Sequence, residues 1–350
     1  LWVAEMDVLP APAVVDAVTD AITIGDTGYA MTRPYREALQ TFAQQRWGWH
    51  FDIEASTCVP DVMRGAMEAI EAATPRGGKV VVNPPVYPPF FAFLAHADRQ
   101  VVEAPLGSDL RIDLEGLERA FAEASANGPA AYLLCSPHNP TATVHSRGEL
   151  AEIAQLAQHY AVRVVVDEIH APLTLPGVRY TPYLDVAADA DAVVLHSASK
   201  GWNLAGIKAA VAIYGEAARP DLAQMPEIVA HGASHLGVIS HTAALRHGVG
   251  WLDEVVAGIA RNVDLFAELV TTHLPDAVYH RGEATYLAWV DVRALGLGDD
   301  PAARLLERAR VAVMSGRSFG RGGDGHIRVN LATSAAIIED AVGRMATNLP

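Results

Sequence analysis

The sequence predicts an α/β fold, with a large domain built on a mostly parallel sheet flanked by helices and a smaller α+β domain. Between about residues 55 and 215, short runs rich in β-branched residues alternate with helix-like stretches, which is the pattern of βαβ units. After about residue 250 the alternation stops, and a long helical pattern precedes separate strand-like runs. We expect the large domain to span residues 25–250 and the small domain to combine residues 1–24 with 251–350.

Five strands are predicted in the large domain, because five runs are almost wholly apolar and end in polar or turn residues. In chain order they are KVVVNPP at 79–85, AAYLLCSP at 130–137, VRVVVDE at 162–168, DAVVLHS at 191–197 and AAVAIYG at 209–215. In such sheets the ligand lies beyond the carboxyl ends of the strands. The residues that follow each run are therefore the candidates for function.

Helices are indicated by their starts and by their apolar spacing. Ser146 and Glu149 form a capping-box pattern at the start of residues 146–161, whose apolar residues then recur on one helical face. Pro60 and Asp61 mark the start of a helix that continues through the GAMEAI stretch. In the small domain, residues 251–274 predict a long helix, TYLAWVDV and GHIRVNLA predict strands, and a final helix begins at about Ala335.

Composition excludes several classes of protein. Hydrophobic residues make up 51% of the 350 positions, which indicates a globular chain, and no stretch is long and apolar enough to span a bilayer. The formal net charge of −15 disfavours nucleic acid and anionic membranes as partners. The two cysteines, Cys58 and Cys135, are far apart in sequence, so a reducing cytoplasm is expected and neither a disulfide framework nor a thiolate metal site is supported.

Polar residues of complementary chemistry follow the predicted strands. Each has an ordinary structural explanation by itself: a turn amide, a helix cap, a packing aromatic or a solvated lysine. Together they suit a flat, electrophilic cofactor, because a lysine amine forms a Schiff base with an aldehyde and a carboxylate keeps a pyridine nitrogen protonated. The sequence therefore predicts a pyridoxal 5′-phosphate (PLP) site. The residues concerned are Tyr87, Asn139, Asp167, His170 and Lys200.

A phosphate position is also predicted. The free backbone N–H groups of Val62 and Met63, in the first turn of the helix that follows Asp61, are suited to an anion. Ser197 and Ser199 add hydroxyl groups from beside Lys200. An ordinary amphipathic helix is the alternative interpretation of the first segment.

Several motifs resemble those of one enzyme family. SASKGWNLAG at 197–206, NPT at 139–141, VVVDEIH at 164–170 and IRVNLA at 327–332 resemble fold-type-I PLP-dependent enzymes, the aspartate aminotransferase superfamily. LWVAEMD at 1–7, GY at 28–29 and PPVYPPF at 84–90, with His170, resemble its cystathionine β-lyase branch, typified by MalY and PatB. The likeness spans nearly the whole chain.

The resemblance implies a role for each candidate. Lys200 would form the Schiff base and move the Cα proton, Asp167 would pair with the pyridinium, and Tyr87 would stack on the ring. Asn139 would bind the phenolic oxygen and the substrate, with His170 nearby. Arg328 would bind the substrate carboxylate, and Trp2 would line the pocket. The phosphate would be surrounded by Val62, Met63, Ser197 and Ser199, and by Tyr29 of a neighbouring subunit in a homodimer with shared active sites.

Two positions depart from the family pattern. Ala142 follows NPT, where the family often has glycine, and Lys208 stands where many aminotransferases hold the phosphate with arginine. Lysine is a point charge and lacks the fork of a guanidinium, so a weaker, absent or different contact is expected there.

The resemblance implies β-elimination from cystathionine or a related cysteine S-conjugate, a small amino-acid substrate. An aminotransferase on the same scaffold is the first alternative, and a non-catalytic, protein-binding regulator is the second. A nucleotide-binding dehydrogenase is disfavoured because no GxGxxG follows an early strand, and FGRGGDG at 319–325 indicates a turn. The histidines between 231 and 247 lack a zinc-protease pattern, and no metal is expected.

Overall fold

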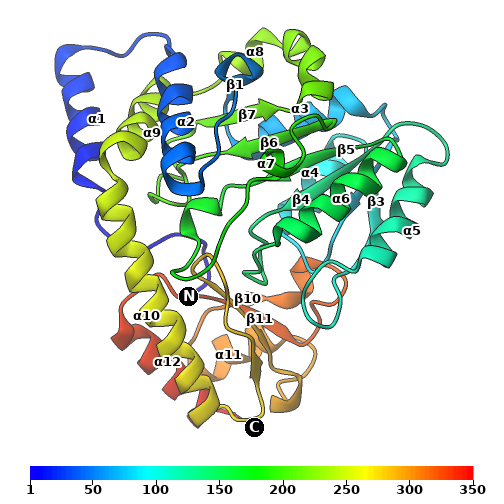
Figure 1. Cartoon of the computed structure of the whole chain (residues 1–350). Coiled ribbons are helices and arrows are strands. Elements are labelled where there is room, and N and C mark those ends of the chain that lie inside the picture. The colour runs from blue at the N-terminus through cyan, green and yellow to red at the C-terminus, as the bar shows by residue number, and fades with distance from the viewer. Residues whose placement is uncertain (350) are drawn as a thin grey trace.

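A computed structural model describes residues 1–349 and contains a seven-stranded central sheet (Figure 1). The strand order is β1-β7-β6-β5-β4-β2-β3. All neighbours from β3 to β6 are parallel, whereas β7 runs antiparallel to both β6 and β1. The predicted mostly parallel sheet is confirmed. The strands are β1 Ser56–Val59, β2 Lys79–Val82, β3 Gln100–Glu103, β4 Ala130–Cys135, β5 Val162–Asp167, β6 Ala192–His196 and β7 Ala210–Tyr214.

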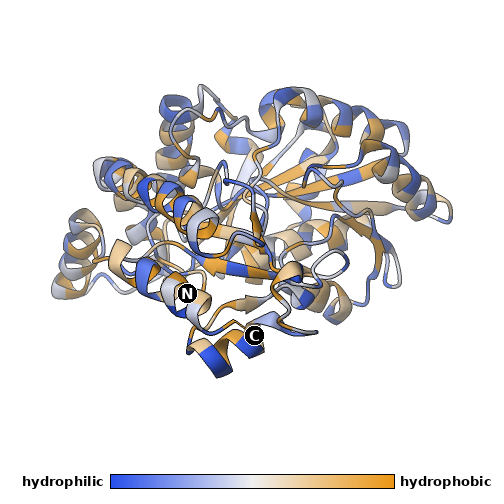
Figure 2. Ribbon diagram, turned by 90° about the horizontal axis from the view of Figure 1, so that it is seen from below, coloured by the Kyte–Doolittle hydropathy of each residue, from blue (hydrophilic) through white to orange (hydrophobic). Residues whose placement is uncertain are grey.

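Helices cover both faces of this sheet. The inner strands are buried throughout, and Figure 2 shows them as largely hydrophobic ribbons at the centre of the molecule. Successive residues of β5 face opposite cores: Val164 and Val166 belong to the cluster with α5 and α6, and Val165 to the cluster with α3 and α4. These helices are α3 Val62–Ala73, α4 Pro89–His96, α5 Leu114–Ser125 and α6 Arg147–His159.

Both helix starts predicted from capping residues are confirmed. Ser146 accepts a hydrogen bond from the backbone of Glu149, whose carboxylate accepts one from the backbone of Ser146, so α6 begins with a full capping box. Asp61 caps α3 by accepting a hydrogen bond of 2.8 Å from the backbone of Arg64. The start of α3 is thereby fixed close to the carboxyl end of the sheet.

The C-terminal part contains a second, antiparallel sheet of order β10-β11-β9-β8. The 25-residue helix α10 (Val249–His273) descends beside it in Figure 1, and α12 (Ala335–Thr347) packs against α10. The long helix, the two strands and the last helix predicted here are confirmed, while the domain boundaries stay a prediction. The remaining elements of this part are β8 Val278–Tyr279, β9 Leu287–Asp291, α11 Pro301–Ala309, β10 Met314–Ser315 and β11 His326–Asn330.

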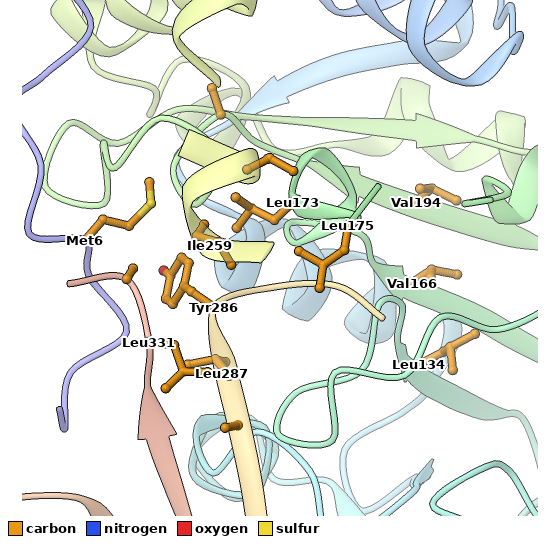
Figure 3. Packing of buried hydrophobic residues seen from close by; sticks show 14 of the residues in the cluster. Met6, Leu134, Val166, Leu173, Leu175, Val194, Ile259, Tyr286, Leu287 and Leu331 are labelled. Carbon is orange, nitrogen blue, oxygen red and sulfur yellow. The ribbon is translucent and has the colours of Figure 1, made fainter. Parts of the chain in front are cut away.

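The N-terminal segment, residues 1–7, joins the two parts. Its backbone bonds to Asn330 on β11 and to Asn203 in the turn after β6, and Figure 3 shows Met6 beside Tyr286 and Leu331. Helix α1 (Pro12–Ile24) follows and packs with α9 (His235–His247), which also contacts α2 (Arg33–Trp47). Short helices complete the fold: α7 Tyr183–Val186 and α8 Glu227–Ala230, with 3-10 turns at Ile53–Ala55, Ala171–Leu173, Glu216–Gln224, Arg293–Leu295 and Gly316–Phe319.

None of the described helices combines the length and the apolar character needed to cross a membrane.

Candidate active site

A cavity of about 510 Å³ lies beyond the carboxyl ends of β4, β5 and β6 and is bordered by the small sheet and the N-terminal segment. Ten of the predicted site residues line it: Trp2, Val62, Met63, Tyr87, Asn139, Asp167, His170, Ser199, Lys200 and Arg328. A second cavity of about 530 Å³, between α6 and α7, has no lysine, arginine, histidine or cysteine in its wall. The chemistry therefore gathers in the first cavity, which we call the active-site cavity.

Asp167 is the last residue of β5 and is 5% exposed. One carboxylate oxygen accepts a hydrogen bond of 3.0 Å from the backbone of Ile169, and no cation of residues 1–349 forms an ion pair with it. Burial raises its pKa to about 6, against the opposing effects of that hydrogen bond and of the charge of Lys200. A buried carboxylate that lacks an ion-pair partner is stabilised by a cationic group placed next to it.

Lys200 lies in the turn that follows β6, and its amino group donates a hydrogen bond of 2.9 Å to the carbonyl oxygen of Ala4. Burial and then the positive charge of Arg328 lower its pKa, whereas Asp167 and Glu5 oppose the change. A lowered pKa increases the fraction of neutral amine, which is the nucleophilic form. Lys200 is therefore suited to attack an aldehyde.

Arg328, on β11, brings the small sheet into the site. Its guanidinium donates to the side-chain oxygen of Asn139 at 3.1 Å and to the carbonyl oxygen of Trp2 at 3.3 Å, and it lies over the ring of Phe319. Burial lowers its pKa to about 10, so it remains cationic at neutral pH. Within residues 1–349 it has no carboxylate partner, and a substrate carboxylate would supply one.

Two polar rings stand near Asp167 and Arg328. Burial and then the charge of Asp167 raise the pKa of Tyr87, which keeps its phenol protonated. Burial and the charges of Lys200 and Arg328 hold the pKa of His170 well below its usual range, so its imidazole is neutral. Its Nδ1 atom has no hydrogen-bond partner within the described part of the chain. Both rings can contact a bound molecule without adding charge.

The predicted phosphate position contains an ion pair that the sequence analysis did not foresee. Lys208 forms an ion pair of 2.8 Å with Asp61, the residue that caps α3, and both line the cavity beside the first turn of α3. Ser199 lines the cavity as well. Ser197 lies behind it, because its hydroxyl group donates to the carbonyl oxygen of Ala209 at 2.7 Å and contacts the Ser199 hydroxyl at 2.8 Å.

Tyr29 lies outside the cavity and is 98% exposed. Within this chain it contributes nothing to the site, and its predicted role needs a second subunit. At the other departure from the family pattern, Ala142 has a φ of 60°, in the left-handed region that glycine tolerates best.

Several residues that line the cavity were not predicted from the sequence. Glu5, Cys135 and Met314 line the cavity, and the carbonyl oxygen of Ala4 holds Lys200. The WVAEMD run contains Glu5 and was noted only as a family resemblance; no local pattern marks it as part of a site.

The residues present fit PLP. The cavity combines a buried carboxylate without an ion-pair partner in residues 1–349, an amine of lowered pKa and an aromatic ring, which match a pyridinium, an aldehyde and a ring face. The α3 start with Ser199 and Lys208 offers donors for a phosphate. Among residues 1–349, no three His, Cys, Asp or Glu side chains gather as metal ligands do.

Residues 3–345 match the family model described as aminotransferase class I and II. A Mycobacterium leprae protein named "Putative cystathionine beta-lyase" is 50% identical over 367 residues, covering 100% of this chain and 91% of that protein. Cystathionine beta-lyase PatB of Bacillus subtilis is 32% identical over 363 residues, covering 100% and 92%.

A solved structure gives the same result for the fold. The crystal structure of a "putative plp-dependent beta-cystathionase" from Corynebacterium diphtheriae has a TM-score of 0.93 at 36% sequence identity, covering 99% of this chain and 92% of that one. These matches confirm the predicted resemblance to fold-type-I PLP enzymes and to their cystathionine β-lyase branch. The chain belongs to the aminotransferase class I and II family.

Proposed function

We propose that the protein is a PLP-dependent carbon–sulfur β-lyase, which eliminates a thiol from cystathionine or a related cysteine S-conjugate and yields pyruvate and ammonia. The observation that carries the proposal is the convergence of Lys200, Asp167 and Arg328 on one cavity. The names of the relatives support the reaction, and their full-length alignment supports its transfer to this chain.

Each group of cavity residues would hold one part of the cofactor. Asp167 would pair with the ring nitrogen, Tyr87 would cover the ring, and Asn139 and His170 would lie at its polar edge. Val62, Met63, Ser199 and Lys208 would surround the phosphate, with Ser197 supporting Ser199 from behind. When bound, PLP supplies an electron sink that stabilises negative charge at the substrate Cα.

The protein residues orient the substrate and move its proton. Arg328 binds the α-carboxylate through a charge-assisted pair, which fixes Cα near Lys200. Lys200, whose pKa is lowered, accepts the Cα proton at Nζ. The bond between Cβ and sulfur then breaks, the thiolate leaves with its electron pair, and the remaining three-carbon fragment is hydrolysed to pyruvate and ammonia.

The reaction is tested by incubating the PLP-loaded protein with cystathionine and measuring thiol, pyruvate and ammonia. A lyase releases all three in equal amounts without any keto acid. An aminotransferase, the first alternative, produces none of them and requires a keto acid as amino acceptor; that outcome would replace the proposal. A non-catalytic regulator, the second alternative, would show neither reaction.

We also propose that the protein works as a homodimer in which Tyr29 reaches the phosphate of the partner's site. Tyr29 is 98% exposed, and apolar residues near it are exposed too: Ile24 at 79% and Met31 at 78%. Such a surface is typical of an interface. Sedimentation should give the mass of a dimer. The Tyr29→Phe variant should bind PLP more weakly and should remain a dimer. A monomer that binds PLP fully would contradict this.

A reducing compartment, such as the cytoplasm, is proposed for the protein. Both Cys58 and Cys135 are buried and free. Mass spectrometry of protein alkylated after unfolding should find both thiols reduced.

A further inference from the structure

Glu5 stands out among the ionisable side chains of the active-site cavity. Asp61 and Lys208 form an ion pair with each other, and Arg328 and Lys200 donate to oxygen atoms of the chain. Asp167 lines the cavity and is the proposed partner of the cofactor ring. Glu5 lines the cavity, and within residues 1–349 its carboxylate forms no ion pair and no hydrogen bond. It is therefore a charge without a partner at the wall of the site.

The backbone that carries Glu5 is fixed on both sides. The side chain of Asn330 donates to the carbonyl oxygens of Val3 and Glu5 at 2.6 and 2.5 Å. The backbone N–H of Met6 donates to the side-chain oxygen of Asn203, and the backbone carbonyl oxygen of Met6 accepts from the side-chain amide of Asn203. Both bonds are 2.9 Å long. Met6 itself is buried beside Tyr286 (Figure 3). The backbone of Glu5 is thus held in place, and its exposed side chain extends from it at the cavity wall.

The position of Glu5 relative to the substrate follows from its neighbours. The carbonyl oxygen of Ala4 accepts hydrogen bonds of 2.9 Å from both Lys200 and Tyr286, and that of Trp2 binds Arg328. The negative charge of Glu5 also opposes the lowering of the Lys200 pKa. With the α-carboxylate on Arg328 and Cα at Lys200, the substrate beyond Cβ would meet the wall formed by residues 2–5, which borders both side chains.

We propose that Glu5 is a specificity-determining residue that selects substrates whose leaving thiol carries a cationic amino group. The inference rests on the proposed β-lyase function and names its substrate class. Cystathionine has such an ammonium on the homocysteine half, beside a carboxylate whose charge the ammonium balances. A distal carboxylate with no ammonium beside it would be repelled by Glu5, and Lys208, the other cation of the wall besides Lys200 and Arg328, is engaged by Asp61. The site therefore discriminates against aspartate and glutamate, the substrates of a dicarboxylate aminotransferase.

The test uses a pair of isosteric substrates, S-(2-aminoethyl)-L-cysteine and S-propyl-L-cysteine, which differ by an ammonium in place of a methyl group. Both release pyruvate, so kcat/KM is measured for each with the PLP-loaded protein. We expect the wild type to prefer the amine by about tenfold or more, the usual size of a charge-assisted hydrogen bond, and Glu5→Gln to abolish the preference. If the ratio of kcat/KM for the two substrates is the same in the wild type and in Glu5→Gln, the proposal is overturned.

Binding provides a readout independent of turnover. L-Lysine and 2-aminoheptanoate are the corresponding carbon analogues and have no leaving group, and their dissociation constants are measured by calorimetry. The ratio of the two constants should fall about tenfold in Glu5→Gln. Asp7→Asn is the matched control, because Asp7 lies in the same segment but outside the cavity wall, and it should leave the ratio unchanged.

Failure of this inference differs from failure of the proposed function. If the wild type eliminates both thiols with the same ratio as Glu5→Gln, only the role of Glu5 is refuted. If the wild type releases no pyruvate from either substrate or from cystathionine, the β-lyase assignment itself is refuted, and the calorimetric ratio still reports on Glu5.

Discussion

The amino group of Lys200 donates a hydrogen bond of 2.9 Å to the carbonyl oxygen of Ala4, 196 positions away in the chain. Tyr286, which directly precedes β9 of the small sheet, donates to the same oxygen. The N-terminal segment therefore positions residues of both the large and the small part. A change in this segment acts on the amine that carries the chemistry, and not only on an exposed end of the chain.

Asp167 makes the stability of the cofactor-free protein depend on pH. Burial raises its pKa to about 6 from an ordinary 3.8, so the ionised form opposes folding. This cost is absent below pH 4, grows between about pH 4 and 6, and is fully present above pH 6. Asp167→Asn without PLP should therefore be more stable than the wild type at pH 8 by about 3 kcal/mol, the equivalent of two pKa units.

Urea unfolding of both cofactor-free proteins between pH 4 and 8 measures this effect. The difference should shrink as the pH falls and vanish near pH 4. PLP should stabilise the wild type more than Asp167→Asn, because its pyridinium compensates the buried carboxylate. A cofactor-free wild type more stable than Asp167→Asn at pH 8 would show that the carboxylate has another partner.

Arg328→Lys should lower kcat/KM for cystathionine by about 100-fold, since lysine keeps the charge but loses the paired N–H groups that bind a carboxylate. Most of the loss should appear in KM. Arg344→Lys, on the exposed face of α12, serves as the control and should behave as the wild type. A normal KM in Arg328→Lys would place the α-carboxylate elsewhere.

Lys208→Met should raise the dissociation constant of PLP about tenfold, because the substitution removes a cation and leaves the Asp61 carboxylate uncompensated beside the phosphate. Fluorescence titration of the cofactor-free protein gives the constant. Lys79→Met, which removes an ion pair with Glu123 far from the cavity, is the matched control. Equal PLP affinity in Lys208→Met and Lys79→Met would exclude Lys208 from the phosphate site.

The inner sheet and much of the site could be predicted because the signals are local. The strands β4, β5 and β6 are apolar runs; Asp167 is the last residue of β5, and Lys200 lies in the turn that follows β6. The strands β1 and β3 were missed, since each has four residues, lies at an edge of the sheet and gives no long apolar run. Ala4 and Glu5 act through contacts with residues about 200 to 300 positions away, which no window of sequence reveals.

Ala142 offers a test of backbone strain. Its φ of 60° costs an alanine about 1 kcal/mol, and glycine avoids this cost. Ala142→Gly should therefore be neutral or stabilising, although glycine loses more conformational freedom on folding. The matched control is Ala154→Gly within α6, which should lower the free energy of unfolding by about 1 kcal/mol. Equal destabilisation of the two variants in urea would show that the loop at Ala142 bears no strain.

The most direct measurement is reduction of the PLP-loaded protein with borohydride, followed by proteolysis and mass spectrometry. Reduction converts an imine between PLP and a lysine into a stable amine. We expect a single pyridoxyl group, on the peptide that contains Lys200, and none in Lys200→Ala, which should also lose the visible absorbance of the bound cofactor. A label on another lysine, or an unchanged spectrum in Lys200→Ala, would contradict the assignment of Lys200 and the account of the site built around it.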